Sequence, residues 1–151
     1  MSISIDGIIN GYIIEMAGLF EGLMIPADLS NLHIIEDKID EVRIALGIDE
    51  SIYGNLLVAV TEAVNNAIIH GSNGREKNDI LLNSRFQNGV LEVEVNDFGE
   101  GFDYINLPDP TSPENLEKEH GRGVFLMRML SDKVDFENNG SKVILTFNLP
   151  K

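Results

Sequence analysis

Two polar side chains four residues apart, Glu62 and Asn66, stand in a segment whose other residues predict a helix with an apolar face. Residues at this spacing lie one above the other on a helix. The apolar residues Ala63 and Ala67 beside them place the pair at the rim of a buried surface. The amide oxygen of Asn66 is a suitable ligand for Mg²⁺, which prefers oxygen ligands and takes part of its coordination shell from phosphate groups. The pair therefore indicates a cleft for a metal–phosphate group.

A second cluster, DFGEGF at residues 97–102, follows directly after an expected strand. A carboxylate at Asp97 can accept a hydrogen bond from the exocyclic amine of adenine. Guanine presents a carbonyl oxygen at that place, so Asp97 would select ATP over GTP. Gly99 and Gly101 allow the backbone to turn sharply and to approach a flat base. This cluster predicts the adenine-binding part of a nucleotide site.

A third cluster, HGRGV at residues 120–124, leads into a short apolar helix. Gly121 and Gly123 at a helix start leave backbone N–H groups exposed, and the helix dipole favours negative charge there. Arg122 and Lys118 are the nearest cations in a chain that has few, and they could offset phosphate charge. A triphosphate would fit at this helix start.

The elements expected around these clusters are mainly helices first and strands later. A strand at residues 23–25 precedes a helix that starts near Asp28 or Ser30 and ends at Gly47. A second helix runs from about residues 49–51 to His70, with Gly71 as its stop. The other expected elements are strands at 80–86 and 90–95 joined at Asn88-Gly89, a long loop at 97–123, a short helix at 124–130, and a hairpin of residues 134–136 and 143–147 turned at 138–140. We therefore predict a two-layer α+β sandwich, with a mixed, mainly antiparallel sheet covered on one face by helices.

Composition indicates one folded domain of ordinary make-up. Hydrophobic residues form 43% and charged residues 24% of the 151 residues, which argues against a disordered or fibrous chain. We expect a single domain over residues 1–151, in which residues 1–22 form an N-terminal extension. This apolar, glycine-containing start could be an extra strand or helix that packs on a neighbour.

Net charge limits the classes of partner that the chain can bind, and the absence of cysteine limits its chemistry. The formal net charge of −14 would repel phosphate backbones and anionic lipid surfaces, so we expect no direct nucleic-acid or membrane partner. We also expect no window with the length and apolarity of a membrane span. The chain has no cysteine, which excludes disulfides, thiolate catalysis and cysteine-ligated zinc, and fits a cytoplasmic location.

Taken together and in this order, the three clusters resemble the GHKL ATP-binding superfamily, which includes DNA gyrase, heat-shock chaperones, histidine kinases and the anti-sigma-factor serine kinases. Residues 62–71 look like its N box, residues 97–101 like its first glycine box and residues 121–123 like its second. The resemblance covers residues 23–149. The run TEAVNNAIIHG and the short lid are most similar to the bacterial anti-sigma regulatory kinases.

The resemblance implies ATP and Mg²⁺ as cofactors, and it implies a role for the residues that match the family's motifs. Asn66 would hold the Mg²⁺ and Asp97 would bind adenine. Glu62 would be the general base that takes the proton from a serine hydroxyl during phosphoryl transfer. A histidine nucleophile has less need of such a base, so Glu62 favours a hydroxyl acceptor, either serine or water. Arg122 is not one of the family's fixed positions, and its role is inferred from its charge.

The first functional hypothesis is therefore a cytoplasmic protein serine kinase that acts as an anti-sigma factor. Its partners would be a sigma factor and an anti-sigma antagonist that it phosphorylates on serine, and a homodimer is also open. Four alternatives remain: a module that binds ATP without phosphotransfer, an ATPase separated from a larger machine, the catalytic half of a split histidine kinase, and a domain of this fold with no nucleotide site.

Overall fold

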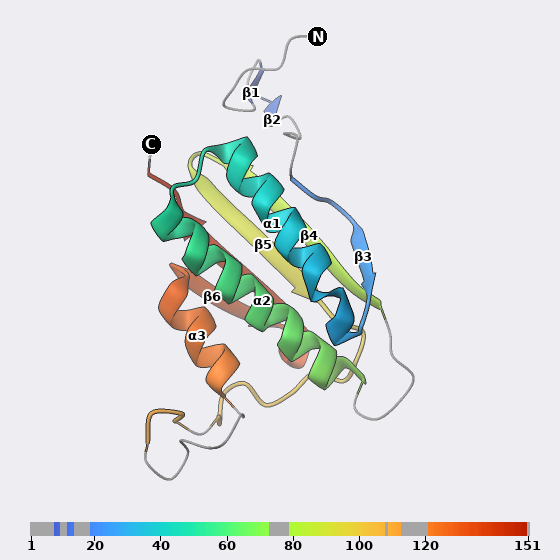
Figure 1. The fold of residues 1–151 in the computed structure, drawn as a ribbon. Coiled ribbons are helices and arrows are strands. Elements are labelled where there is room, and N and C mark those ends of the chain that lie inside the picture. The colour runs from blue at the N-terminus through green and yellow to red at the C-terminus, as the bar shows by residue number, and fades with distance from the viewer. Residues whose placement is uncertain are drawn as a thin grey trace.

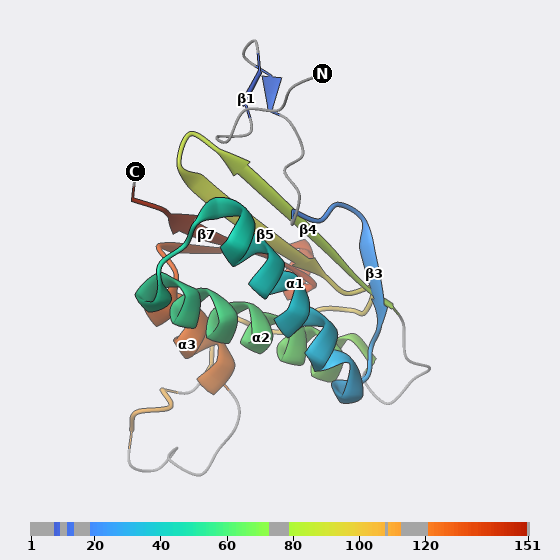
Figure 2. The ribbon, with the colours of Figure 1, turned by 45° about the horizontal axis from the view of Figure 1, so that its top comes forward.

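The computed structural model describes residues 8–9, 12–13, 19–72, 79–107, 109–112 and 121–150. Among these, five strands form one sheet in the order β3-β4-β5-β7-β6, and α1, α2 and α3 lie on the same face of it (Figures 1 and 2). The pairings in this sheet are all antiparallel. The predicted two-layer α+β sandwich is confirmed. The sheet, expected to be mixed, contains no parallel pair among the described strands.

The expected helices and strands are all present, with ends that differ by a few residues. The helices are the single turn η1 (Leu29–Asn31), α1 (Leu32–Leu46), α2 (Glu50–Ser72) and α3 (Arg122–Leu130). The strands of the sheet are β3 (Leu23–Pro26), β4 (Asp79–Gln87), β5 (Val90–Asn96), β6 (Lys133–Glu137) and β7 (Lys142–Asn148), with the turn η3 (Asn138–Gly140) between the last two. Two further strands, β1 (Ile8–Ile9) and β2 (Tyr12–Ile13), pair with each other in the N-terminal extension.

The ends of α1 follow from local sequence. The Asp28 carboxylate accepts a hydrogen bond of 2.9 Å from the Ser30 N–H and starts the single turn before the helix. Gly47 adopts a left-handed conformation with φ 64°, and its N–H donates to the Arg43 carbonyl. The fully buried residues of α1 are Ile35, Ile39 and Val42. The predicted stop at Gly47 is confirmed, whereas Asp28 caps the preceding turn η1 and α1 itself begins after Asn31, which makes no side-chain capping bond.

The central helix, α2, carries the buried face that its sequence predicts. The four apolar residues named for this face are all buried: Leu56, Val60, Ala63 and Ala67. The helix continues through Gly71 to Ser72, so the predicted stop at Gly71 is wrong. A glycine permits a left-handed helix end but does not require one, because it also adopts helical angles. Apart from Ser72, the loop expected at residues 72–78 lies outside the described residues.

A second correction concerns membrane-span length. Residues 50–70 of α2 are long and apolar enough to cross a membrane, judged by length and composition alone, contrary to the expectation that no window reaches this length. Core helices of globular domains share these properties. One face of α2 packs on the sheet, where Leu56, Val60 and Val64 have no exposed surface. The packing therefore identifies α2 as the core helix of a two-layer domain.

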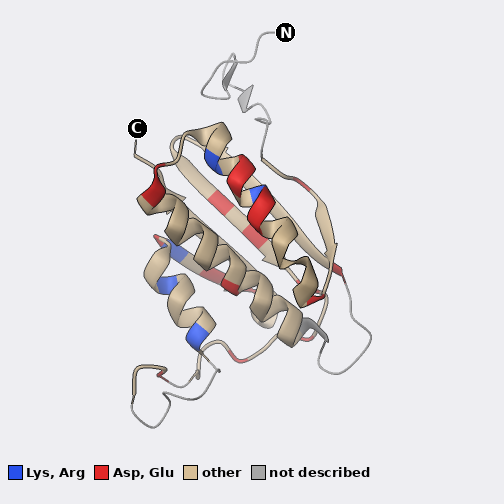
Figure 3. Ribbon diagram, viewed as in Figure 1, with Lys and Arg blue, Asp and Glu red and all other residues tan. Residues whose placement is uncertain are grey.

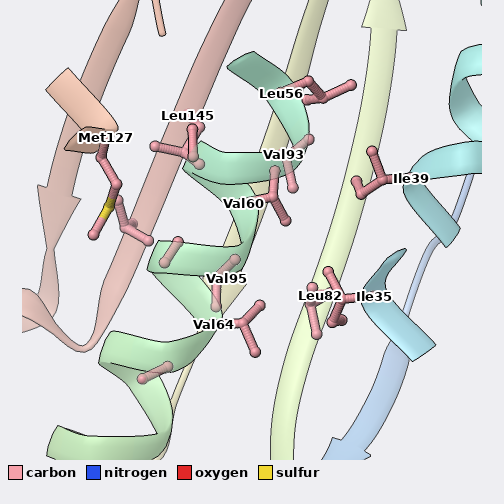
Figure 4. Close-up of a cluster of buried hydrophobic side chains, with 14 of the residues drawn as sticks. Ile35, Ile39, Leu56, Val60, Val64, Leu82, Val93, Val95, Met127 and Leu145 are labelled. Atoms are coloured by element: carbon pink, nitrogen blue, oxygen red, sulfur yellow. The ribbon is translucent and has the colours of Figure 1, made fainter. Parts of the chain in front are cut away.

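The hydrophobic core lies between the helix layer and the sheet (Figure 4). Side chains of α1, α2 and α3 meet those of the strands there, including Ile35, Ile39, Leu56, Val60, Val64, Leu82, Val93, Val95, Met127 and Leu145. Because side chains alternate between the two faces of a strand, β5 buries Leu91, Val93 and Val95 against the helices. Its end is thereby fixed beneath α2, which positions the residues that follow it.

Two tight turns connect the paired strands as predicted. Asn88 and Gly89, with φ values of 52° and 77°, join β4 to β5 in a two-residue hairpin. Asn138, Asn139 and Gly140 also have positive φ values and join β6 to β7. In the part of the long loop that is described, residues 97–107 and 109–112, there is no helix or strand.

Part of the N-terminal extension attaches to the sheet beside β4. The Phe20 N–H donates to the Ser84 hydroxyl at 2.7 Å, and the Ser84 N–H donates to the Phe20 carbonyl at 2.6 Å. The Gly22 N–H donates to the Asn83 side chain at 2.6 Å. Phe20 itself is buried in the core cluster. The extension therefore contributes to the domain from Phe20 onward.

Candidate nucleotide site

Three segments that are far apart in the sequence meet at one end of the helix layer. They are the C-terminal half of α2, the loop that leaves β5, and the first turn of α3 (Figure 1). The side chain of Glu62 lies against Gly123 of α3, and the ring of His70 stacks on Phe102 of the loop. Each of the three predicted clusters supplies one of these segments, so the fold brings the clusters together.

Glu62 is a half-buried carboxylate directly beside the start of α3. A Cβ atom built on Gly123 would lie 3.0 Å from Glu62 Oε2, so a side chain at this position would crowd the carboxylate. Burial raises the pKa of the Glu62 carboxyl above its usual value. Among the described residues, no hydrogen-bond donor is seen on this carboxylate. A carboxylate with a raised pKa and no donor from these residues is suited to accept a proton.

The first turn of α3 has the form of an anion site. Gly121 precedes it in a left-handed conformation, φ 84°, and no side chain caps the helix. Its first N–H groups have no acceptor within the helix and carry the positive end of the helix dipole. Arg122 is exposed at this end, and α3 carries basic but no acidic residues, unlike α1 (Figure 3). The phosphate-binding role of residues 121–123 stays a prediction, and an uncapped helix start is chemically compatible with it.

Glu62 at the start of α3 also has a simpler interpretation. A negative side chain next to a helix N-terminus is stabilised by the helix dipole and needs no catalytic purpose. Burial raises the pKa of the Glu62 carboxyl, which favours proton uptake by this group. We therefore favour the interpretation as a base, and the two interpretations predict opposite effects on stability.

Asn66 lies one turn beyond Glu62 on the same side of α2 and is half-buried. His70, one turn further, contacts the loop after β5. Asn66 therefore faces the space between the start of α3 and that loop. Among the described residues there is no group of three His, Asp or Glu side chains that could hold a metal. The amide oxygen of Asn66 could serve as a protein ligand of Mg²⁺, because Mg²⁺ can take most of its other ligands from phosphate groups and water.

Asp97, directly after β5, is the one charged or polar residue among the described ones that is buried, with 8% of its surface exposed. Its N–H donates to the Ser141 carbonyl, and its Oδ1 accepts from the Gly99 N–H, both at 2.8 Å. Burial raises the pKa of the Asp97 carboxyl, and the hydrogen bond from Gly99 partly opposes this. A buried carboxylate without a cation beside it among the described residues is costly, and an amine donor such as that of adenine would offset the cost.

Sequence reasoning missed the contacts that hold the loop after β5. The rings of His70 and Phe102 are stacked, with centroids 4.5 Å apart and planes inclined by 10°. Phe102 also meets Tyr104 and Phe136 edge-on, at 6.2 and 5.7 Å. The sequence predicts His70 only as the last residue of a helix. The aromatic residues at 102, 104 and 136 were the available signal, but no sequence pattern pairs residues this far apart.

Two predicted residues cannot be placed. Lys118, expected to offset phosphate charge, and His120 lie outside the described residues. Gly99 and Gly101 are in the loop as expected, and Gly101 has φ 84°, a conformation that favours glycine. The residues that can be placed have chemistry that suits ATP and Mg²⁺: a buried acceptor at Asp97, an amide oxygen at Asn66, a carboxylate at Glu62 and an uncapped helix start at Gly121.

The fold, together with the order of the three clusters, is that of a two-layer domain of the GHKL type. The chain belongs to the histidine kinase-like ATPase domain family, whose sequence model matches residues 25–147. This range contains every predicted site residue. The resemblance first seen in three short clusters therefore extends over most of the chain.

Among known proteins, the chain is similar to serine-protein kinases named RsbW. The Oceanobacillus iheyensis kinase is 29% identical over 129 residues, which are 82% of this chain and 82% of that protein. The Bacillus pumilus kinase is 30% identical over 141 residues, or 87% of this chain and 86% of that protein. The kinase of Staphylococcus aureus strain MRSA252 is 27% identical over 142 residues, 87% of this chain and 88% of that protein.

Proposed function

We propose that this protein is a cytoplasmic, Mg²⁺-dependent serine kinase that acts as an anti-sigma factor in a partner-switching system. Its partners would be a sigma factor and an antagonist protein that it phosphorylates on serine. The kinase part is supported by the similarity to serine-protein kinases over more than four-fifths of the chain. The partner-switching part rests on the resemblance of the run TEAVNNAIIHG to the anti-sigma regulatory kinases.

The observation that carries the proposal is the place of the Glu62 carboxylate against Gly123. When bound, Mg·ATP would supply the phosphoryl group that is transferred. Asp97 would select adenine, Asn66 would hold the metal, and residues 121–123 would receive the phosphates through backbone N–H groups. Glu62, beside that helix start, would accept the proton of the serine hydroxyl. A protein that only stored ATP would not need a half-buried carboxylate with a raised pKa at this point.

The proposal is tested by ATP binding followed by phosphoamino-acid analysis. Calorimetric titration should give Mg²⁺-dependent binding of ATP and much weaker binding of GTP. Purified protein with γ-labelled ATP and a heat-treated extract of the producing cells should then label a protein with acid-stable phosphate, as expected for phosphoserine. Acid-labile label would instead indicate a split histidine kinase. ATP binding without any labelled acceptor would favour a binding module without phosphotransfer.

A first prediction concerns the metal ligand. Replacing Asn66 with alanine should remove the Mg²⁺-dependent part of ATP affinity, roughly a 10- to 100-fold loss, because even partners of metal ligands contribute on this order. Affinity measured without Mg²⁺ should stay close to that of the unmodified protein. Alanine is a good helix former, so α2 should persist. Asn55→Ala, at an exposed position of the same helix, is the control and should bind Mg·ATP normally.

A second prediction concerns pH. Only the carboxylate form of Glu62 can accept a proton, and burial raises its pKa. At saturating ATP, single-turnover phosphotransfer should therefore fall as the pH drops through this raised pKa, at a higher pH than an exposed glutamate would give. The residual activity of Glu62→Gln should lack this acid limb. If the activity of Glu62→Gln falls at low pH in the same way as that of the unmodified protein, the titrating group is not Glu62.

A further inference from the structure

The turn between β6 and β7, Asn138–Gly140, lies against the loop that carries Asp97, although the two segments are far apart in the chain. The Asp97 N–H donates to the Ser141 carbonyl, directly after the turn, at 2.8 Å. The Phe102 N–H donates to the Asn139 carbonyl at the same distance. Both ends of the segment 97–102 are therefore bonded to the turn or to the residue after it.

Two glycines allow this close approach. A Cβ atom on Gly101 would lie 2.0 Å from the Asn139 carbonyl oxygen. A Cβ atom on Gly140 would lie 2.8 Å from the Phe102 carbonyl oxygen and 2.9 Å from Phe102 Cδ1. Real Cβ atoms do not approach other atoms this closely, so one of the two segments would have to move. The turn and the loop fit together only because both positions lack a side chain.

The loop is held from the opposite side as well. The ring of Phe102 stacks on His70 of α2 at a centroid distance of 4.5 Å, and its edge meets Phe136 of β6. Phe102 is thereby enclosed by the helix layer, the turn and the end of β6. A shift of Phe102 would be transmitted along a short, bonded loop to Gly99, whose N–H donates to the Asp97 carboxylate.

We propose that the β6–β7 turn is a positioning element of the nucleotide site and that Gly140 is a positioning residue for Asp97. By leaving room for Phe102, Gly140 fixes the loop against the sheet and so fixes the carboxylate that selects adenine. Gly140 does not contact the nucleotide in this proposal. The inference rests on the proposed function for its effect on ATP, while its effect on the loop is independent of any nucleotide.

The test compares Gly140→Ala with Gly89→Ala. Gly89 occupies the β4–β5 turn with φ 77°, and a Cβ atom there would make only an ordinary contact of 3.5 Å with the Leu149 carbonyl oxygen. Both variants carry the strain of alanine in the left-handed region. Only Gly140→Ala should also displace Phe102. The difference between the variants therefore isolates the close approach from the backbone strain.

Two measurements decide the outcome. In nucleotide-free protein, amide hydrogen exchange at Gly99 and Phe102 should become at least about tenfold faster in Gly140→Ala and stay unchanged in Gly89→Ala. In titrations, Gly140→Ala should bind ATP about tenfold more weakly, with a reduced preference for ATP over GTP. Equal effects of the two variants on exchange and affinity would overturn the proposal.

Phe102→Ala covers the case in which Gly140→Ala does not fold, because it removes the ring without adding volume. Exchange at Gly99 should again accelerate, and Phe102→Tyr, which keeps the stack on His70, should restore it. Unchanged exchange at Gly99 in Phe102→Ala would overturn the proposal. If the unmodified protein binds no ATP, the proposed function fails, whereas the exchange data still decide whether the turn holds the loop.

Discussion

Glu62→Gln should reduce phosphotransfer to serine by about 100- to 10,000-fold, the usual contribution of a general base, while Mg·ATP still binds. Glutamine keeps the size of the side chain, so the contact with Gly123 is retained. It cannot accept the hydroxyl proton at neutral pH. Transfer is measured as single-turnover labelling of the acceptor, and binding by titration. Glu36→Gln, on the exposed face of α1, is the matched control and should have no effect on either quantity.

The same variant separates the two interpretations of Glu62 through stability. Because burial raises the pKa of Glu62, the folded protein holds this proton more tightly than the unfolded chain. Stability therefore falls as the pH rises from the ordinary pKa through the raised one, and the cost is fully present above the raised pKa. Glutamine avoids it, so Glu62→Gln should melt at or above the temperature of the unmodified protein. A clear loss of stability would indicate that Glu62 mainly serves the N-terminus of α3.

The fold was predictable where local pattern decides structure. The repeat of Leu56, Val60, Ala63 and Ala67 predicts the buried face of α2, and Asn88-Gly89 predicts a hairpin whose register is then fixed. Gly71 was misjudged because a glycine is compatible with both a helix and its end. Local rules describe what a residue permits, and packing decides which option is taken.

The residues of the candidate site were predictable from the sequence, but the contacts that hold their segments together were not. The residue types of the three clusters indicate their chemistry, and the family relationship implies that they meet. Sequence alone does not show that His70 stacks on Phe102, or that Gly101 and Gly140 allow the β6–β7 turn to support the loop. These contacts depend on the strand order β5-β7-β6, which places the start of the loop beside a turn encoded far downstream.

Asp97→Asn should change which nucleotide the protein prefers. Asp97 Oδ1 accepts a hydrogen bond from the Gly99 N–H, and the same oxygen of asparagine can keep this bond. The amide NH₂ then takes the place of the second carboxylate oxygen. A donor would face the amine donor of adenine, whereas it would match the carbonyl oxygen of guanine. Loss of a hydrogen bond to a charged group, about 1.5–3 kcal/mol, predicts ATP binding weaker by roughly 10- to 100-fold.

Titrations with ATP and GTP check this prediction, with Asp37→Asn at an exposed position of α1 as the control. GTP affinity should rise in Asp97→Asn while ATP affinity falls, because a general loosening of the loop would weaken both. The melting temperature should not fall at neutral pH, since burial raises the pKa of Asp97 and the neutral amide avoids the cost of burying a charge. Equal loss of both nucleotides, together with lower stability, would mean that Asp97 supports the loop and does not read the base.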